Sequence, residues 1–220
     1  MTASQLIIES LPPIKLNEKC SKAVSWMSEF KISHLPVVND NTFEGIISEE
    51  SLLDFNYKNE TIAESNIQLM HVFTYEYQHI FEAMKQMSDN HLTILHILDR
   101  NDNYIGSTTL SHLMTLTTNT TSVKEPGGVI VLSVNSKDYS LAQIAQIVES
   151  NNARILSSFI TSSPETTEME VTIKINKKDL GPILQTFNRY DYTVIESYQK
   201  EQNHDEMKDR FDYLMKRLDL

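Results

Sequence analysis

Two stretches of the sequence repeat one spacing of a glycine, a hydroxyl side chain and a further polar residue, with two residues between successive members. The members are Gly45, Ser48 and Ser51 in the first stretch, and Gly106, Thr109 and His112 in the second. A hydroxyl at a helix start can cap the helix, and the backbone N–H groups of the same turn can bind an anion. Capping is the simpler interpretation of Ser48 and Thr109, and contact with a ligand is the alternative.

Other residue types that carry chemistry are not grouped in the sequence. Cys20 is the single cysteine, which excludes an internal disulfide and a cysteine-rich metal site. His91 and His96 are five residues apart around a strand-like stretch, so strand alternation would place them on opposite faces. The sequence also lacks the GxSxG, P-loop, HExxH and GxGxxG motifs. We therefore expect no bound metal and no catalytic site.

The polar motifs lie inside a longer repeat with an offset of about sixty residues. Residues 31–39 return with nearly the same pattern as residues 91–99. A stripe of apolar residues at helical spacing precedes each copy: Cys20, Ala23, Val24 and Met27 in the first, and Ile80, Ala83, Met84 and Met87 in the second. A fixed period of this kind indicates a duplicated unit.

Each copy predicts the element order β-α-β-β-α. In the first copy, residues 14–16 are extended, 35–38 form a buried strand and 45–47 form the returning strand, after which a helix starts behind Ser48. In the second copy the corresponding strands are 95–98 and 106–109, and the last helix begins near Leu110.

The helical stripe, the Leu-Pro-Val-Val strand and the Gly-aliphatic-aliphatic-Ser strand together resemble a CBS domain, and two in tandem resemble a CBS-domain pair. The pair would span residues 1–118, with units at about 10–56 and 70–118. The resemblance implies that the units pack through their sheets, and that the clefts between them bind adenosine-containing ligands. The ligand-binding residues implied in this way are Ile14, Leu16, Pro36, Ser48, Ser51, His96, Thr109 and His112.

The sequence departs from that family at positions where a nucleotide would be held. The family commonly has an aspartate for the ribose hydroxyls, and Ser51 and His112 stand at that position here. His96 also replaces the proline that the first copy has as Pro36. No cofactor is required, and an adenine nucleotide or S-adenosylmethionine would be a regulatory ligand held without the ribose-binding carboxylate.

A polar, threonine-rich stretch from Thr115 to Pro126 predicts a boundary loop, with the linker at 119–126. Residues 127–200 then predict the order β-α-β-β-α-β of a ferredoxin-like domain, so the whole chain is of the α+β class. This domain resembles an ACT domain, and the combination is similar to acetoin-utilisation accessory proteins. The family's ligand loop would fall on Asp138, Tyr139 and Ser140. Tyr139 stands where the family has a glycine and would fill the pocket, so dimerisation is the alternative to sensing an amino acid.

Residues 201–220 predict an amphipathic helical tail, because Met207, Phe211, Leu214 and Leu218 are spaced four, three and four residues apart. Packing on its own domain is one interpretation. Pairing with a second subunit, or with a client protein, is the other.

Composition limits the classes of partner. The formal net charge is −11 and no cluster of Lys and Arg occurs, so we expect no nucleic acid partner. No run of eighteen apolar residues and no basic, apolar leader occurs, so we expect no membrane span and a cytoplasmic location.

These observations favour a non-catalytic cytosolic regulatory module, a homodimer that senses a small metabolite and changes its own assembly or the activity of a partner. The alternative is a dimerisation or assembly scaffold whose clefts bind no ligand. A weaker alternative is an enzyme with an unrecognised site.

Overall fold

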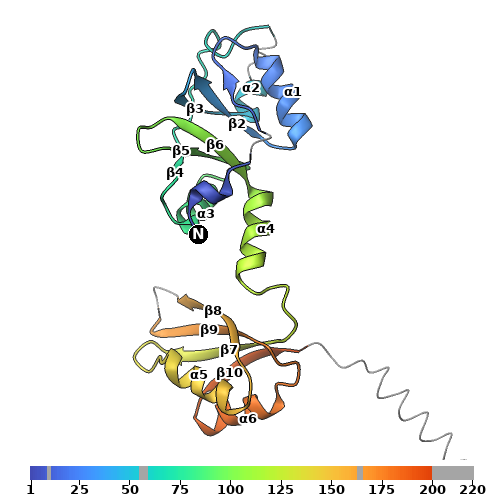
Figure 1. Ribbon diagram of the computed structural model, residues 1–220, viewed down its shortest axis with the longest axis vertical. Coiled ribbons are helices and arrows are strands. Elements are labelled where there is room, and N and C mark those ends of the chain that lie inside the picture. The colour runs from blue at the N-terminus through green and yellow to red at the C-terminus, as the bar shows by residue number, and fades with distance from the viewer. Residues whose placement is uncertain (9–10, 55–58, 163–165, 200–220) are drawn as a thin grey trace, which may run out of the picture. The chain divides into compact units, whose positions relative to one another are not determined.

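The computed structural model describes residues 1–8, 11–54, 59–162 and 166–199, and the predicted tail at 201–220 lies outside these ranges. The chain divides into two compact units, Met1–Thr117 and Thr118–Leu220, which are described separately (Figure 1).

The first unit contains both copies of the repeat. The first copy comprises β1 (Ile14–Lys15), α1 (Cys20–Phe30), β2 (His34–Asn39), β3 (Thr42–Ser48) and α2 (Glu49–Asp54). The second comprises β4 (Thr74–Tyr75), α3 (Ile80–Asp89), β5 (Ile94–Leu98), β6 (Tyr104–Thr109) and α4 (Leu110–Thr120). The element order predicted from the sequence is therefore present twice.

Strand register repeats as well. Each copy has a three-stranded sheet, ordered β1-β2-β3 or β4-β5-β6, in which the first pair is parallel and the second antiparallel. Ile14 pairs with Val37, and sixty residues later Thr74 pairs with Ile97. Because the period holds between paired residues and not only along the chain, the duplication extends to the sheets.

The helical stripes face the cores as the spacing predicts. Cys20, Ala23 and Met27 are buried on α1, and the second copy buries the corresponding residues of α3. Lys31 and His91 follow the two helices with φ of 57° and 51°. His91 thus lies in a helix-ending turn and not beside a strand, so the argument that strand alternation separates it from His96 was wrong about its position.

The segments that precede each copy cross to the other copy. Ile8 forms a bridge with Ser107 of β6, and Met70 forms a bridge with Ile46 of β3. A short 3-10 helix, η1 (Ala3–Leu6), adds buried side chains to the core of the second copy. No structure was predicted for Met1–Ile8, whose backbone N–H groups at Ala3, Ser4 and Ile8 donate to carbonyls of the second copy.

Helix α4 continues to Thr120, into the stretch that the sequence predicted as a loop from Thr115 onward. Threonine has a low helix propensity, but here its hydroxyl bonds back to the carbonyl four residues earlier, from Thr115 to Ser111 at 3.0 Å and from Thr117 to Leu113 at 2.8 Å. Within the described ranges, no helix is long and apolar enough to cross a membrane.

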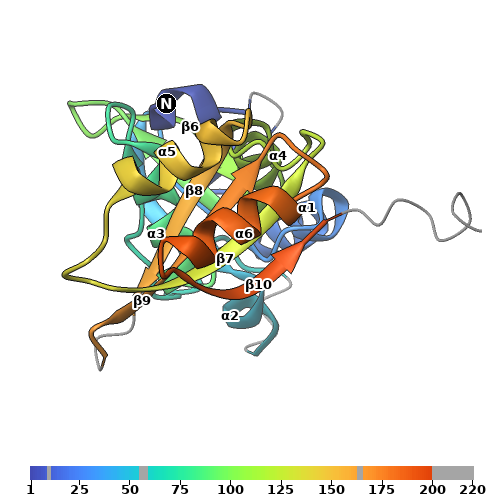
Figure 2. The same ribbon diagram turned by 90° about the horizontal axis from the view of Figure 1, so that it is seen from below.

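The second unit has the order β-α-β-β-α-β. Its elements are β7 (Gly128–Asn135), α5 (Leu141–Ser150), β8 (Ile155–Ser162), β9 (Glu168–Ile175), α6 (Gly181–Arg189) and β10 (Thr193–Tyr198). The sheet is antiparallel, in the order β10-β7-β9-β8, and Figure 2 shows α5 and α6 on the same face of it. Alternate residues of β7 and β9 are buried under these helices.

Candidate functional site

The two hydroxyls of the repeated motif cap helices. The Ser51 backbone N–H donates to the Ser48 Oγ at 3.1 Å, and the His112 backbone N–H donates to the Thr109 Oγ1 at 3.1 Å. These are the bonds of an N-cap to the third helical residue. The capping interpretation therefore accounts for both hydroxyls, and their contact with a ligand stays a prediction.

The two motif glycines are required by the crossing segments. Gly45 has a φ of +144°, and a Cβ added there would lie 2.6 Å from the Cβ of Leu69. Gly106 has a φ of +157°, and an added Cβ would lie 2.6 Å from the Cγ2 of Ile7. Each glycine allows a crossing segment of the same chain to approach closely, so its presence does not require a bound nucleotide.

Neither of the positions expected for the ribose-binding aspartate carries a carboxylate. Ser51 is partly buried, and its hydroxyl is hydrogen-bonded to the hydroxyl of Ser48. His112 is also partly buried. The arrangement offers hydroxyl and imidazole groups, which form weaker contacts with ribose hydroxyls than a carboxylate does.

His96 is, like Ser107 and Thr108, a fully buried polar residue of the second copy. It is fully buried, its Nδ1 lies 2.9 Å from the Ser107 Oγ, and that hydroxyl is 2.8 Å from the Tyr104 Oη. The Nε2 atom has no hydrogen-bond partner among the described residues. Burial, together with the nearby charge of His34, lowers the pKa of His96 to about 3, so the ring is neutral at physiological pH.

At the matching position of the first copy, Pro36 is paired with Ile46, and both are buried. In the second copy His96 is paired with Ser107. The repeat therefore places a polar pair where the first copy has an apolar one, and that pair lies within the protein core.

His34 joins the two copies, which the sequence did not predict. Its Nδ1 lies 3.2 Å from the Thr93 Oγ1, and the Ser33 backbone N–H donates to the same hydroxyl at 2.9 Å. Burial lowers the pKa of His34. Ser33 and Thr93 are sixty residues apart and occupy equivalent positions of the two copies, but the offset alone does not show that they are in contact.

The remaining predicted residues of the first unit belong to its cores. Ile14 is fully buried in the first copy, and Leu16 is partly buried against the same core. Their contribution to a ligand site is untested, and their packing explains why both positions are apolar.

The predicted loop of the second unit is also structural. Tyr139 packs against the apolar core of this unit, and the Ser140 Oγ accepts from the Gln143 backbone N–H at 3.3 Å as the N-cap of α5. Asp138 is exposed. The tyrosine side chain thus lies partly in the core, next to the loop where the sequence placed a ligand.

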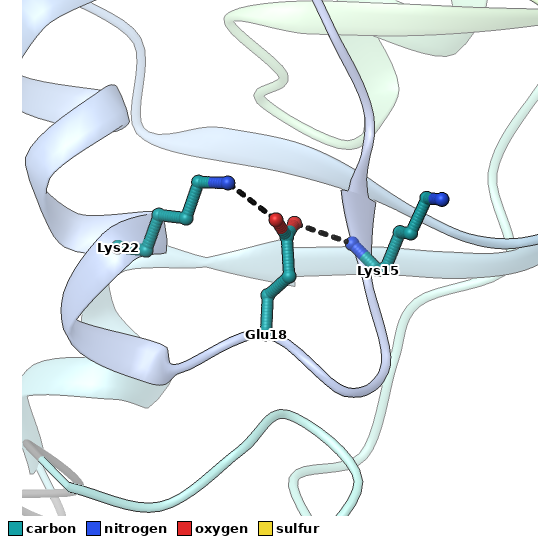
Figure 3. Close-up of polar contacts among 3 residues, drawn as sticks. All are labelled: Lys15, Glu18 and Lys22. Atoms are coloured by element: carbon teal, nitrogen blue, oxygen red, sulfur yellow. Dashed lines mark hydrogen bonds and ion pairs between the residues drawn. The ribbon is translucent and has the colours of Figure 1, made fainter.

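A charged contact near the start of α1 was also missed. The Glu18 carboxylate accepts from the Lys15 backbone N–H at 3.0 Å and pairs with the Lys22 ammonium (Figure 3). That ammonium lies 4.4 Å from the centroid of the Trp26 ring. The spacing of Glu18 and Lys22, four residues apart, was the sequence signal for this pair.

No group of three or more His, Cys, Asp or Glu side chains that could hold a metal ion occurs within the ranges that the structure describes.

Comparison with protein families matches residues 3–57 to the CBS domain. The matched residues span the N-terminal segment and the first copy of the repeat. A search of curated proteins finds no match.

The solved structures that are similar to this chain include the following three. A CBS domain pair/ACT domain protein from Thermotoga maritima has a TM-score of 0.48 and 16% identity, over 54% of this chain and 98% of that chain. A candidate acetoin utilization protein from Vibrio cholerae has a TM-score of 0.47 and 18% identity, over 54% of this chain and 91% of that chain. CBSX2, solved in complex with AMP, has a TM-score of 0.46 and 18% identity, over 54% of this chain and 96% of that chain.

Proposed function

We propose that residues 1–118 are a CBS-domain pair that acts as a non-catalytic regulatory module in the cytosol, and that residues 127–200 are an ACT-like domain. The observation that carries this proposal is the duplicated register, in which two sheets of the same order are joined by reciprocal crossing segments. The family match to residues 3–57 supports it for the first copy. The order β10-β7-β9-β8, with both helices on one face, supports it for the second unit.

The module would act by binding a small metabolite better in one arrangement of the paired copies than in another. Adenosine-containing ligands are the first class to test, although Ser51 and His112 replace the expected carboxylate. A ligand at one hundred times its Kd should stabilise the folded protein by about 2.7 kcal/mol. Melting of the full chain, followed by Trp26 fluorescence, with AMP, ADP, ATP, S-adenosylmethionine and NAD tests this. No shift with any of them at millimolar concentration would exclude adenosine sensing.

Two substitutions that should increase affinity give a more specific test of adenosine binding. Ser51→Asp and His112→Asp restore the ribose-binding carboxylate and should each raise affinity for AMP about tenfold, since a charged hydrogen bond replaces a neutral one. Ser51→Asn and His112→Asn are matched controls, because the amide has the same shape without the charge. Equal affinities of the Asp and Asn variants, measured by calorimetry, would show that these positions do not face a ribose.

The second candidate function is a scaffold that binds no ligand. It is favoured by the finding that capping and the crossing segments explain the motif residues Ser48, Thr109, Gly45 and Gly106 without a nucleotide. It requires self-association, in which the predicted tail at 201–220 would take part. Sedimentation of the full chain and of a chain ending at Tyr198 tests this, and a monomer in both would exclude the scaffold.

A further inference from the structure

The second copy has an open pocket of about 260 Å³ beside α3. The aromatic rings of Phe73 and Tyr75 line it from the chain leading into and through β4, and Gln78, Glu82 and Gln86 line it from the start and face of α3. Glu82 and Gln86 are four residues apart on α3 and therefore lie on one face of that helix, and Gln78 lies two residues before the helix begins. The pocket thus combines aromatic walls with a polar strip.

Some of the polar groups of this strip already accept hydrogen bonds within the protein. The Gln78 Oε1 accepts from the Tyr75 backbone N–H at 2.7 Å and from the Thr74 hydroxyl at 2.9 Å. The Glu82 Oε1 accepts from the Gln86 Nε2 at 2.9 Å. Glu82 is partly buried, and the lining contains no Lys or Arg. His71 also lines the pocket, but no permanently charged cation does. A carboxylate beside aromatic rings without such a cation favours a positively charged occupant.

The first copy shows what occupies the matching position there. At an offset of sixty residues, Glu18 corresponds to Gln78, Lys22 to Glu82 and Trp26 to Gln86. In that copy the Lys22 ammonium pairs with Glu18 (Figure 3). The same ammonium lies 4.4 Å from the centre of the Trp26 ring. The first copy therefore supplies its own ammonium group between a carboxylate and an aromatic ring.

The second copy retains a carboxylate and aromatic rings but supplies no ammonium. Its carboxylate has moved to the position of the lysine, and its rings come from Phe73 and Tyr75. We propose that this pocket binds a small organic ammonium ion with an apolar body. The ammonium would face Glu82, and the apolar body would lie against Phe73 and Tyr75. The volume limits the ligand to a molecule of about the size of a monoamine with one ring.

This proposal does not depend on adenosine sensing. The pocket is lined by residues of β4, α3 and the chain before them, and the motif residues Ser51 and His112 do not line it. A protein that ignores every adenosine ligand can still bind an amine here, and the reverse also holds.

The direct test is a nuclear magnetic resonance titration of the full chain, following the backbone amides of residues 71–86. Benzylammonium chloride is the probe, and benzyl alcohol is the matched uncharged control, with sodium chloride keeping the ionic strength constant. We expect saturable shifts with benzylammonium and at least tenfold weaker binding of the alcohol. Equal binding of the two probes, or no shift of these amides with benzylammonium, would overturn the proposal.

Two variants test the site itself. Glu82→Gln removes the charge and should weaken benzylammonium binding about tenfold while leaving benzyl alcohol unaffected. Glu29→Gln, on an exposed position of α1, makes the same charge change away from the pocket and should have no effect. Unchanged affinity in Glu82→Gln would overturn the proposal.

The double variant Gln78→Glu with Glu82→Lys copies the first repeat and places an ammonium in the pocket. It should abolish benzylammonium binding while the far-ultraviolet circular dichroism spectrum is retained. Because this variant adds a favourable pair, it serves if Glu82→Gln alone does not fold. Binding that persists in the folded double variant would equally overturn the proposal.

Discussion

The two copies of the repeat share their strand register and differ in the polar groups that they hold. At the sheet centre, the first copy buries Pro36 beside Ile46, and the second buries His96 beside Ser107. At the helix start, the first copy has the Glu18–Lys22 ion pair, and the second has an open pocket beside Glu82. The backbone bonds that fix the fold are therefore the same in both copies, and the side chains that could give them separate roles are not.

The first prediction concerns Gly45 and Gly106, where the crossing segments approach the two sheets. An alanine Cβ at Gly45 would meet the Leu69 Cβ at 2.6 Å and the Met70 carbonyl at 3.1 Å, both fixed by the backbone, whereas at Gly106 its nearest neighbour would be the Cγ2 of Ile7 at 2.6 Å, which rotation about χ1 can displace. Gly45→Ala should lower the free energy of unfolding by roughly 3 to 5 kcal/mol, from backbone strain and overpacking together. Gly106→Ala should cost roughly 1 to 3 kcal/mol, because the side chain of Ile7 can move. Urea unfolding followed by Trp26 fluorescence measures both, and equal costs would contradict the reasoning.

The buried His96 adds a pH dependence to the second copy at a position where the first copy has the non-titrating Pro36. The pKa of His96 is about 3 in the folded protein, against 6.5 for an unperturbed histidine, so below pH 6.5 the unfolded chain binds a proton that the folded chain does not. Stability from this group is complete above pH 6.5 and falls by about 1.4 kcal/mol per pH unit toward pH 3. The loss reaches about 2.7 kcal/mol at pH 4.5.

His96→Gln should remove that part of the slope while keeping a partner for Ser107. The exposed His91→Gln is the control, and His34, whose pKa is also lowered by burial, is unchanged in both variants. Unfolding free energies at pH 7.0 and 4.5 give the comparison. The same pH dependence in His96→Gln and in the unchanged protein would show that His96 is accessible to protons in the folded state.

The sequence predicts those elements whose residues recur at a regular local spacing, and not the contacts between isolated residues far apart in the chain. Buried stripes such as Cys20, Ala23 and Met27 recur at helical spacing, so the helices and the repeat were predictable. The bridges of Ile8 to Ser107 and of Met70 to Ile46 involve isolated residues with no period of their own, and the first spans about a hundred residues. Nothing local distinguishes such a segment from a loop.

The candidate site was predictable to a smaller extent. Spacing identified Ser48 and Thr109 as caps, but the volume beside Glu82 depends on which side chains leave space, which no spacing encodes. The contrast between Lys22 and Glu82 was nevertheless visible at an offset of sixty residues. Comparing the copies for charge as well as for apolar pattern would have found it.

The two caps give a third prediction, in which the copies should behave alike. Ser48→Ala and Thr109→Ala should each lower the free energy of unfolding by about 1 kcal/mol, because each leaves one N–H of the first helical turn without its acceptor. Ser48→Asp and Thr109→Asp retain an acceptor and should cost only a few tenths of a kcal/mol. A cost for alanine that appears only when AMP is present would assign these hydroxyls to a ligand in place of the helix end.

The smallest expected change in stability concerns Glu18 at the start of α1. Substitutions there separate the contribution of its ion pair from that of its hydrogen bond to the backbone. The Glu18 carboxylate accepts from the Lys15 backbone N–H at 3.0 Å, and in the second copy an uncharged amide, Gln78, accepts from the Tyr75 backbone N–H at 2.7 Å. Burial alone would raise the pKa of Glu18, but the hydrogen bonds from Lys22 and Lys15 lower it overall.

Glu18→Gln should therefore cost less than about 1 kcal/mol, since it removes a solvent-exposed ion pair and keeps the backbone bond. Glu18→Ala should cost about 1 kcal/mol more, because the N–H of Lys15 loses its acceptor. Unfolding in low and high salt distinguishes the two terms, as only the charge term is screened. If Glu18→Gln proved as costly as Glu18→Ala in low salt, and both costs fell together in high salt, the ammonium of Lys22 and not the backbone bond would hold the helix start.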